Sequence, residues 1–198
     1  MKKSMCILTF ILLALTNCSN DSKSFTDMTS AENQKQINSE NIFENYLKTL
    51  EQIPLPFSHN PFEQLPALSK NYNKTVFEKY KHVWTTQPLG ILFNDSKTVT
   101  LIDFAIGDLG LVPFLTTYDR QGIKIDSLGP YKKTGEDMGY KAIEYLTIFK
   151  DKTISVSDSV TIYTLKPDSS DIDKTSIKLT IGLTKYTIEA DGHFRKQK

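Results

Sequence analysis

Short stretches of alternating apolar and polar residues fill the chain after Trp84 and constrain its fold more than any other feature. Alternation with a period of two is the pattern of a strand that has one buried face and one wet face. In "TVTLIDFAI" (98–106), Ile102, Phe104 and Ile106 fall on one face. We therefore expect about nine or ten strands, each with its apolar face toward the core. Similar runs cover residues 123–125, 145–149, 154–156, 160–163, 177–181 and 186–188.

The breaks between these runs are short and carry turn residues, which limits how the strands connect. They include "NDSK" (94–97), "GDLG" (107–110), "DRQG" (119–122), "KDK" (150–152) and "DG" (191–192). Links of this length join only antiparallel neighbours. The sequence therefore predicts a mainly β fold with a minor α component: an antiparallel up-and-down meander, either a curled sheet or a barrel. Residues 131–140 show no alternation, and we expect a long mobile loop there.

The N-terminus has the layout of a secretory signal peptide. Lys2 and Lys3 precede an apolar or small run of 11 residues, Met5 to Leu15, and a strongly polar stretch begins at Ser19. This order of charged, apolar and polar segments is typical of export signals. Because spanning a bilayer takes about 20 apolar residues, we do not expect a permanent transmembrane helix here.

The segment from Leu15 to Cys18 resembles the lipobox of bacterial lipoproteins, in which the signal is cut before a cysteine that then carries lipid. Asn17 departs from the pattern, because most lipoboxes have Gly, Ala or Ser at that position. The resemblance implies a signal peptide over residues 1–17 and an acylated Cys18, the palmitate anchor that holds the chain to the outer membrane. An ordinary secreted protein with an incidental cysteine is the alternative.

Cysteine usage agrees with lipidation. Cys6 lies in the segment to be removed, so Cys18 is the only cysteine of the mature chain. An odd cysteine in an exported protein requires an explanation, and acylation supplies one. Removing residues 1–17 leaves 22 Lys+Arg against 23 Asp+Glu, a net charge of −1. Near neutrality argues against nucleic acid as a partner, since capture of nucleic acid needs a concentrated positive field.

The mature chain divides into a tether and one domain. Residues 18–39 are polar and too poor in large apolar groups to repay ordering, so we expect a flexible tether. Residues 40–198 form a single β-rich domain that begins with a helical and Pro-rich segment. Apolar residues at spacings of three and four predict a helix over 40–52, packed on the sheet or, alternatively, offered to a partner. The four prolines of 54–66 predict an extended connector, and a second short helix is expected at 74–81.

No set of residues carries a recognisable chemistry, so we expect no cofactor, no metal, no catalytic residue and no enzymatic activity. His59, His82 and His193 lack metal-ligand spacing, and no nucleophile motif is present. Asp168, Asp171 and Asp173 share a loop without the ligand pattern of a calcium site. Asp103 interrupts an apolar strand, and if it is buried in a cavity it becomes a candidate ligand contact or acid/base group. Tyr131 and Tyr140 are candidate aromatic contacts for a ligand or partner.

Four stretches together resemble small envelope lipoproteins of Bacteroidetes-type bacteria. They are the lipobox, "LPF" at 55–57, "TYDRQGIKIDSL" at 117–128 and "YTIEADGHF" at 186–194. The resemblance covers most of the mature chain. It implies a lipid-anchored envelope protein with a β-rich domain, and it carries no catalytic residues.

Two kinds of function remain open. The first is a non-enzymatic protein-binding module: an assembly factor, an inhibitor or an immunity-type protein with an envelope protein as partner. The second is a carrier that holds a small lipid, glycan or peptide inside a β-barrel-like cavity. In both cases we expect a monomer held to the membrane through the lipid on Cys18.

Overall fold

The computed structural model describes residues 42–64, 69, 71–167 and 171–198. The predicted signal peptide, Cys18 and the tether lie outside these residues. The described chain is mainly β, as predicted, with a helix over residues 42–47 and a second helix, α2 (Lys74–Tyr80). The strands are β1 (Phe57–His59), β2 (Gln87–Asn94), β3 (Thr98–Gly107), β4 (Gly110–Asp119), β5 (Lys124–Leu128), β6 (Gly135–Asp137), β7 (Tyr140–Ile148), β8 (Thr153–Leu165), β9 (Ile172–Ile188) and β10 (Phe194–Lys196).

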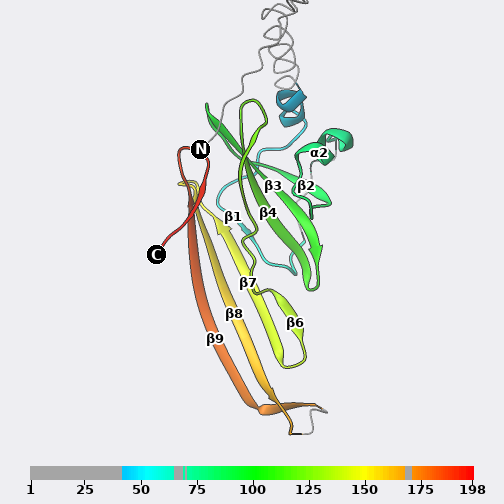
Figure 1. The fold of residues 1–198 in the computed structure, drawn as a ribbon, viewed down its shortest axis with the longest axis vertical. Coiled ribbons are helices and arrows are strands. Elements are labelled where there is room, and N and C mark those ends of the chain that lie inside the picture. The colour runs from blue at the N-terminus through cyan, green and yellow to red at the C-terminus, as the bar shows by residue number, and fades with distance from the viewer. Residues whose placement is uncertain (1–41, 65–68, 70, 168–170) are drawn as a thin grey trace, which may run out of the picture.

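The ten strands form two antiparallel sheets (Figure 1). One sheet has the order β2-β3-β4-β5, and the other has the order β1-β7-β8-β9-β10 with β6 on the same edge of β7 as β1. Strands that follow one another in the chain are neighbours from β2 to β5 and again from β6 to β10, so the predicted up-and-down meander occurs twice. Only β1 departs from chain order, because it pairs with β7. The chain crosses between the sheets after Leu128, where Gly129 and Pro130 end β5. Across the described residues the strands therefore form two open sheets, and the predicted barrel alternative is wrong.

The two sheets pack face to face around the main core. Ile102, Phe104 and Leu115 of the first sheet meet Leu146 and Ile148 of the second, and all five are almost fully buried. The predicted alternation in β3 thus places Ile102 and Phe104 in the core as expected. Ile106, at the end of β3, is instead 77% exposed.

Helices cover the other face of the first sheet, so that it forms the middle of three layers. Phe43, Tyr46 and Phe77 from the helices pack against Val99 and Leu101 of β3. The prediction that each strand has one wet face is therefore wrong for β3, whose residues from Thr98 to Ala105 are all buried. A helix packed on the sheet was predicted, but its described part ends at residue 47, earlier than expected. The second helix lies where it was predicted.

The proline-rich connector lies along both sheets. Ile53 and Phe57 are buried, and Ile53 N donates to the Ile91 carbonyl at 2.8 Å, so the connector begins beside β2. It then contributes β1 to the edge of β7. No helix among the described residues is long and apolar enough to cross a bilayer.

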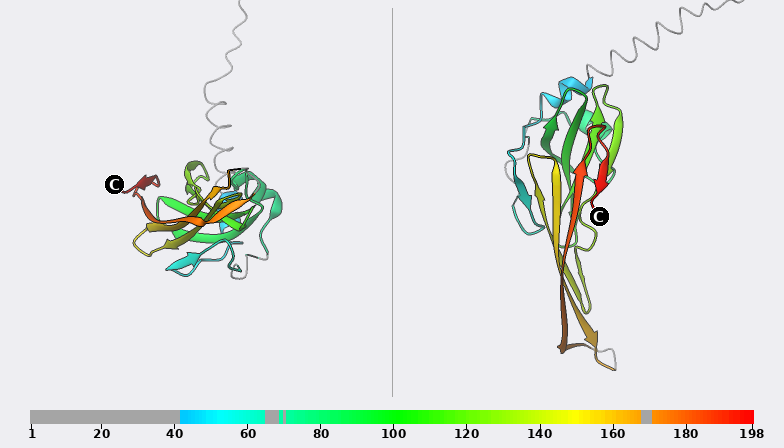
Figure 2. Two further views of the ribbon diagram at one scale, coloured as in Figure 1. Left: turned by 90° about the horizontal axis from the view of Figure 1, so that it is seen from below. Right: turned by 90° about the vertical axis from the view of Figure 1, so that its left-hand side faces the viewer.

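Strands β7, β8 and β9 continue well beyond the first sheet and form a narrow extension (Figures 1 and 2). The segment predicted as a mobile loop, 131–140, includes β6 and joins this extension through the β6–β7 hairpin. The first sheet therefore covers one face of β7, β8 and β9 along part of their length and leaves the rest of that face beyond it. The two faces of the extension differ sharply in what covers them.

Candidate partner-binding surface

The outer face of β9 carries a row of exposed apolar side chains. Ile177, Leu179, Ile181 and Leu183 alternate along the strand and are 57%, 58%, 77% and 61% exposed. Because successive side chains of a strand point to opposite faces, all four lie on one side of the sheet. We call these four residues the β9 stripe. Single exposed apolar residues are ordinary, but a contiguous apolar patch on a protein surface marks an interaction site.

The β8 residues beside the β9 stripe on the same face have small side chains, which do not cover it. Thr161 pairs with Leu179, Ser159 with Ile181 and Ser157 with Leu183, so three of the four stripe residues have a short hydroxyl side chain beside them. Beyond these, β7 places Ile143 and Tyr145 on the same face. On this face, short hydroxyl side chains of β8 therefore lie between the β9 stripe and the half-exposed Tyr145.

Part of the opposite face of the extension is covered by residues 132–134 of the chain itself. Glu144 is buried on the inner face of β7, and its Oε2 accepts hydrogen bonds from the backbone N–H groups of Lys132, Lys133 and Thr134 at 2.7–2.8 Å. The Thr134 hydroxyl donates to the same oxygen at 2.9 Å. Four donors satisfy this buried carboxylate, so it holds residues 132–134 against the sheet.

An ion pair between the half-exposed Lys133 and the buried Asp158 strengthens this attachment. The ammonium of Lys133 lies 2.7 Å from Asp158 Oδ2, and Asp158 is almost fully buried on the inner face of β8. The hydrogen bond from Lys133 to Asp158 raises the pKa of the lysine. Glu144 and Asp158 therefore use part of the inner face to organise the protein's own chain, whereas the described residues leave the β9 stripe on the outer face exposed.

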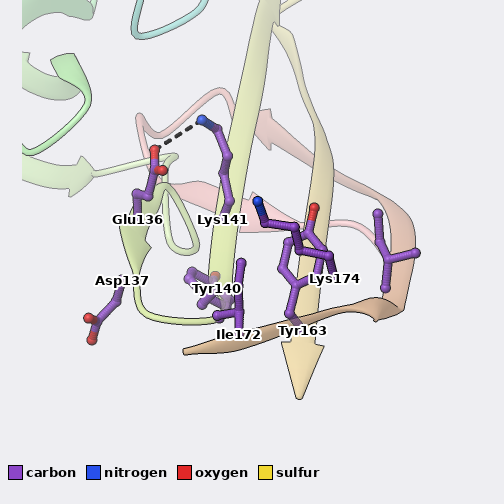
Figure 3. Close-up of a pocket in the computed structure, with 9 residues that line it drawn as sticks. Glu136, Asp137, Tyr140, Lys141, Tyr163, Ile172 and Lys174 are labelled. Atoms are coloured by element: carbon purple, nitrogen blue, oxygen red, sulfur yellow. Dashed lines mark ion pairs between the residues drawn. The ribbon is translucent and has the colours of Figure 1, made fainter. Parts of the chain in front are cut away.

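A surface pocket of about 350 Å³ lies at the far end of the extension (Figure 3). Tyr140, Tyr163 and Ile177 supply its apolar surface, and Lys141 forms an ion pair of 3.0 Å with Glu136 at its rim. The Tyr140 hydroxyl donates to the Lys133 carbonyl at 2.8 Å, which fixes its ring beside the pocket. Ile177 belongs both to the pocket and to the β9 stripe, so the two are one continuous surface.

The structure separates the two tyrosines predicted as contacts. Tyr140 lines the pocket, where its role in binding stays a prediction. Tyr131 lies in the main core and is only 9% exposed. Its hydroxyl donates to the His59 carbonyl at 2.8 Å, and burial raises the pKa of the phenol. A ring enclosed in this way does not reach a partner, because the chain from His59 and the two sheets already surround it.

Asp103, the third predicted contact, lies far from this surface. It points from β3 into the helical layer and is 3% exposed. Burial raises its pKa to about 8, while a hydrogen bond from the His82 backbone and the charge of Lys81 lower the pKa by less. Arg120, which follows the end of β4, does not neutralise Asp103, because its guanidinium lies 3.5 Å from Glu44. Asp103 is thus a buried group of the helix–sheet contact.

The residues that shape the candidate surface were missed for an identifiable reason. Residues 177–181 were recognised as a strand with an apolar face, but that face was assigned to the core. Glu144 and Asp158 interrupt the apolar faces of β7 and β8, and this interruption is the signal that the inner face of the extension is partly polar. Comparison of the chain with protein-family models, curated proteins and solved structures found no match.

Proposed function

We propose that this protein is a non-enzymatic protein-binding module of the cell envelope, acting as an assembly factor, an inhibitor or an immunity-type protein. It is anchored to the outer membrane through a lipid on Cys18, and it binds an envelope protein with the outer face of β7–β9. The observation that carries this proposal is the β9 stripe, in which four exposed apolar side chains follow one another along one face of β9.

The arrangement of the surface suits a protein partner. Binding energy at protein interfaces comes mostly from a few aliphatic or aromatic anchors that become fully buried. The β9 stripe supplies aliphatic anchors, and Tyr145 supplies an aromatic one on the same face. Tyr140 and Tyr163 supply aromatic surface at the pocket. Lys141 and Lys174 stand beside them as polar neighbours. The anchors lie on β strands, so little conformational entropy is lost when they bind.

The interior gives less support to a carrier of small ligands. A carrier needs an enclosed apolar cavity, whereas the space between the two sheets is filled by large side chains such as Phe104, Leu146 and Ile154, each fully buried. Three cavities lined by described residues, of about 280, 350 and 470 Å³, open at the surface.

The test is co-purification from the native envelope. A tagged wild-type chain is compared with the double variant Ile181→Asn, Leu183→Asn and with the control Ile106→Asn. Ile106 and Ile181 are both isoleucines that are 77% exposed, so the change to asparagine removes an equally exposed apolar side chain at each position. We expect one stoichiometric protein with the wild type and the control, and its loss with the double variant. Equal recovery with all three chains contradicts the proposal.

A further inference from the structure

Among the described strands, only β10 pairs with the outer edge of β9, and it does so near one end. In the sheet order, β9 lies between β8 and β10, but β10 pairs only with residues 186–188. Beyond them, Gln197 N donates a hydrogen bond of 2.9 Å to the Lys185 carbonyl, and residues 196–198 line a surface pocket together with residues 183–185. No described strand pairs with the outer edge from residue 172 to 184. Exposed edges are usually blunted by proline, inward charges or a covering loop, because an open edge is a template for pairing.

We infer that this edge pairs with the same edge of a second copy of the protein. The two β9 strands run antiparallel and are centred on Thr180, so that residues whose numbers add to 360 lie opposite each other. This makes a two-fold symmetric, self-complementary contact. The inference goes beyond the proposed function and does not depend on it, and it replaces the monomer that we expected from the sequence.

The apolar residues of β9 favour this register. Ile177 then lies opposite Leu183 of the second copy, and Leu179 lies opposite Ile181, with each pair repeated by symmetry. All four stripe residues thereby gain an apolar cross-strand neighbour. A shift of two residues in one direction places Ile177 opposite Lys185, and a shift in the other direction places Leu183 opposite Thr175. Only the register centred on Thr180 pairs all four with one another.

The charges are compatible with the same register. The three lysines of this stretch would otherwise repel one another, since like charges directly opposite destabilise a sheet. In the proposed pairing, Lys178 faces Gly182 of the second copy, whereas Lys174 and Lys185 lie beyond the paired stretch, because β10 and Gln197 already occupy the edge from Lys185 onward. No lysine lies opposite another lysine.

Backbone geometry also agrees. The Lys185 carbonyl accepts its hydrogen bond from outside the β8–β9 ladder, so odd-numbered residues of this part of β9 direct their N–H and C=O groups toward the outer edge. The proposed register places odd residues opposite odd residues, which is the arrangement that forms hydrogen-bonded pairs. Thr180 then meets its symmetry mate as a non-hydrogen-bonded pair.

The ends of the free edge match the length of the pairing. At one end, β10 and Gln197 occupy the edge up to Lys185. At the other end, the β8–β9 register is interrupted between Asp173 and Lys178, which bends the strand. The regular free stretch between these limits is 178–184, so Thr180 lies near its middle and Ile177 pairs with Leu183 just outside it. Because the sandwich sits at one end of the extension (Figure 1), antiparallel pairing places the two sandwiches at opposite ends of the joint sheet.

Disulfide trapping tests this register. The full chain with Cys6→Ser and Cys18→Ser is given one new cysteine, Thr180→Cys, or the control Thr184→Cys on the same face of β9. Facing residues of a non-hydrogen-bonded pair have Cα atoms about 4.5 Å apart, within disulfide range. Two copies of residue 184 are displaced by eight residues, or about 27 Å. We expect rapid covalent dimer formation with Thr180→Cys and at least tenfold slower formation with Thr184→Cys.

Light scattering of the purified chain provides the second measurement, because it needs no new cysteine. The wild type is expected to show a concentration-dependent dimer mass, and Ile181→Lys, which places a charge opposite Leu179, is expected to raise the dissociation constant at least tenfold. A monomer mass at all concentrations, or equal trapping at residues 180 and 184, overturns the inference. A chain that stays monomeric when pure yet recovers a different envelope protein overturns only this inference and leaves the proposed function standing.

Discussion

Gly182 of β9 and Asp158 of β8 lie directly opposite each other, and the absent side chain of Gly182 leaves the space that the Asp158 carboxylate occupies. A Cβ on residue 182 would lie 2.9 Å from Asp158 Cγ, closer than real side chains approach. Asp158 is in turn bound to Lys133. Gly182 of β9 therefore leaves room for the ion pair between Lys133 and Asp158, which attaches residues 132–134 to the extension.

Gly182→Ala is expected to destabilise the protein by roughly 1–3 kcal/mol, since the added methyl group displaces Asp158 from Lys133. Chemical unfolding measures the change. Gly135→Ala is the control, because the nearest atom to a Cβ on residue 135 is 3.9 Å away and the methyl group fits. The control should change stability by no more than about 0.5 kcal/mol. Equal effects of the two substitutions would contradict the role assigned to Gly182.

Glu144→Gln is expected to release residues 132–134 from the sheet. Glutamine keeps the size of the side chain but replaces the charged acceptor of four hydrogen bonds with a neutral amide. We expect a loss of about 1–3 kcal/mol and faster amide hydrogen exchange at Lys132, Lys133 and Thr134.

Glu136→Gln is the matched control for this experiment. Glu136 lies on the neighbouring strand and forms an exposed ion pair with Lys141, so its loss should cost less than about 1 kcal/mol. If exchange at residues 132–134 is as slow in Glu144→Gln as in Glu136→Gln, the carboxylate does not hold this segment.

Asp103→Asn is expected to change how stability depends on pH. Burial raises the Asp103 pKa from 3.8 to about 8, so between these values the folded protein keeps a proton that the unfolded chain releases. This stabilising contribution is complete below about pH 4 and is lost as the pH rises toward 8, with a slope approaching about 1.4 kcal/mol per pH unit. The asparagine variant should gain stability relative to the wild type from pH 5 to pH 7. A constant difference in unfolding free energy over that range would contradict the assignment.

Cys18→Ser is expected to move the protein from the membrane fraction to the soluble envelope fraction without altering the domain. The prediction follows from the proposed lipid anchor, because one acylated cysteine carries the whole attachment. Fractionation of cells and the circular dichroism spectrum of the released protein measure the two parts. A variant that remains in the membrane fraction would show that Cys18 is not the anchor.

Local patterns were sufficient to predict most strands and their antiparallel links. The stretch "GDLG" forms the β3–β4 hairpin, and Gly110 there has a φ of +132°, which only glycine adopts easily. The 74–81 helix was also predicted almost to the residue, because the spacing of Val76, Phe77 and Tyr80 marks one side, and the structure adds Asn73 as the cap of its first turn. These features depend on neighbours in the sequence, so sequence alone identifies them.

The face that each strand buries depends on distant parts of the chain and was not predictable in the same way. Leu101 and Ile102 are both buried because separate layers cover the two faces of β3. Leu179 and Ile181 are exposed because the first sheet is shorter than β9 and packs on the other face of the extension. The same uncertainty affected Tyr131, whose burial depends on His59, 72 residues away.

The central claim is that the outer face of β7–β9 binds another envelope protein, and site-specific photo-crosslinking in the native host tests it most directly. A photoreactive amino acid is placed at Ile181 in one chain and at the equally exposed Ile106 in another. We expect one discrete adduct with a different envelope protein from residue 181, beside any dimer of the chain itself, and none from residue 106. The same adducts from both positions, or only dimers of the chain from residue 181, would contradict the account.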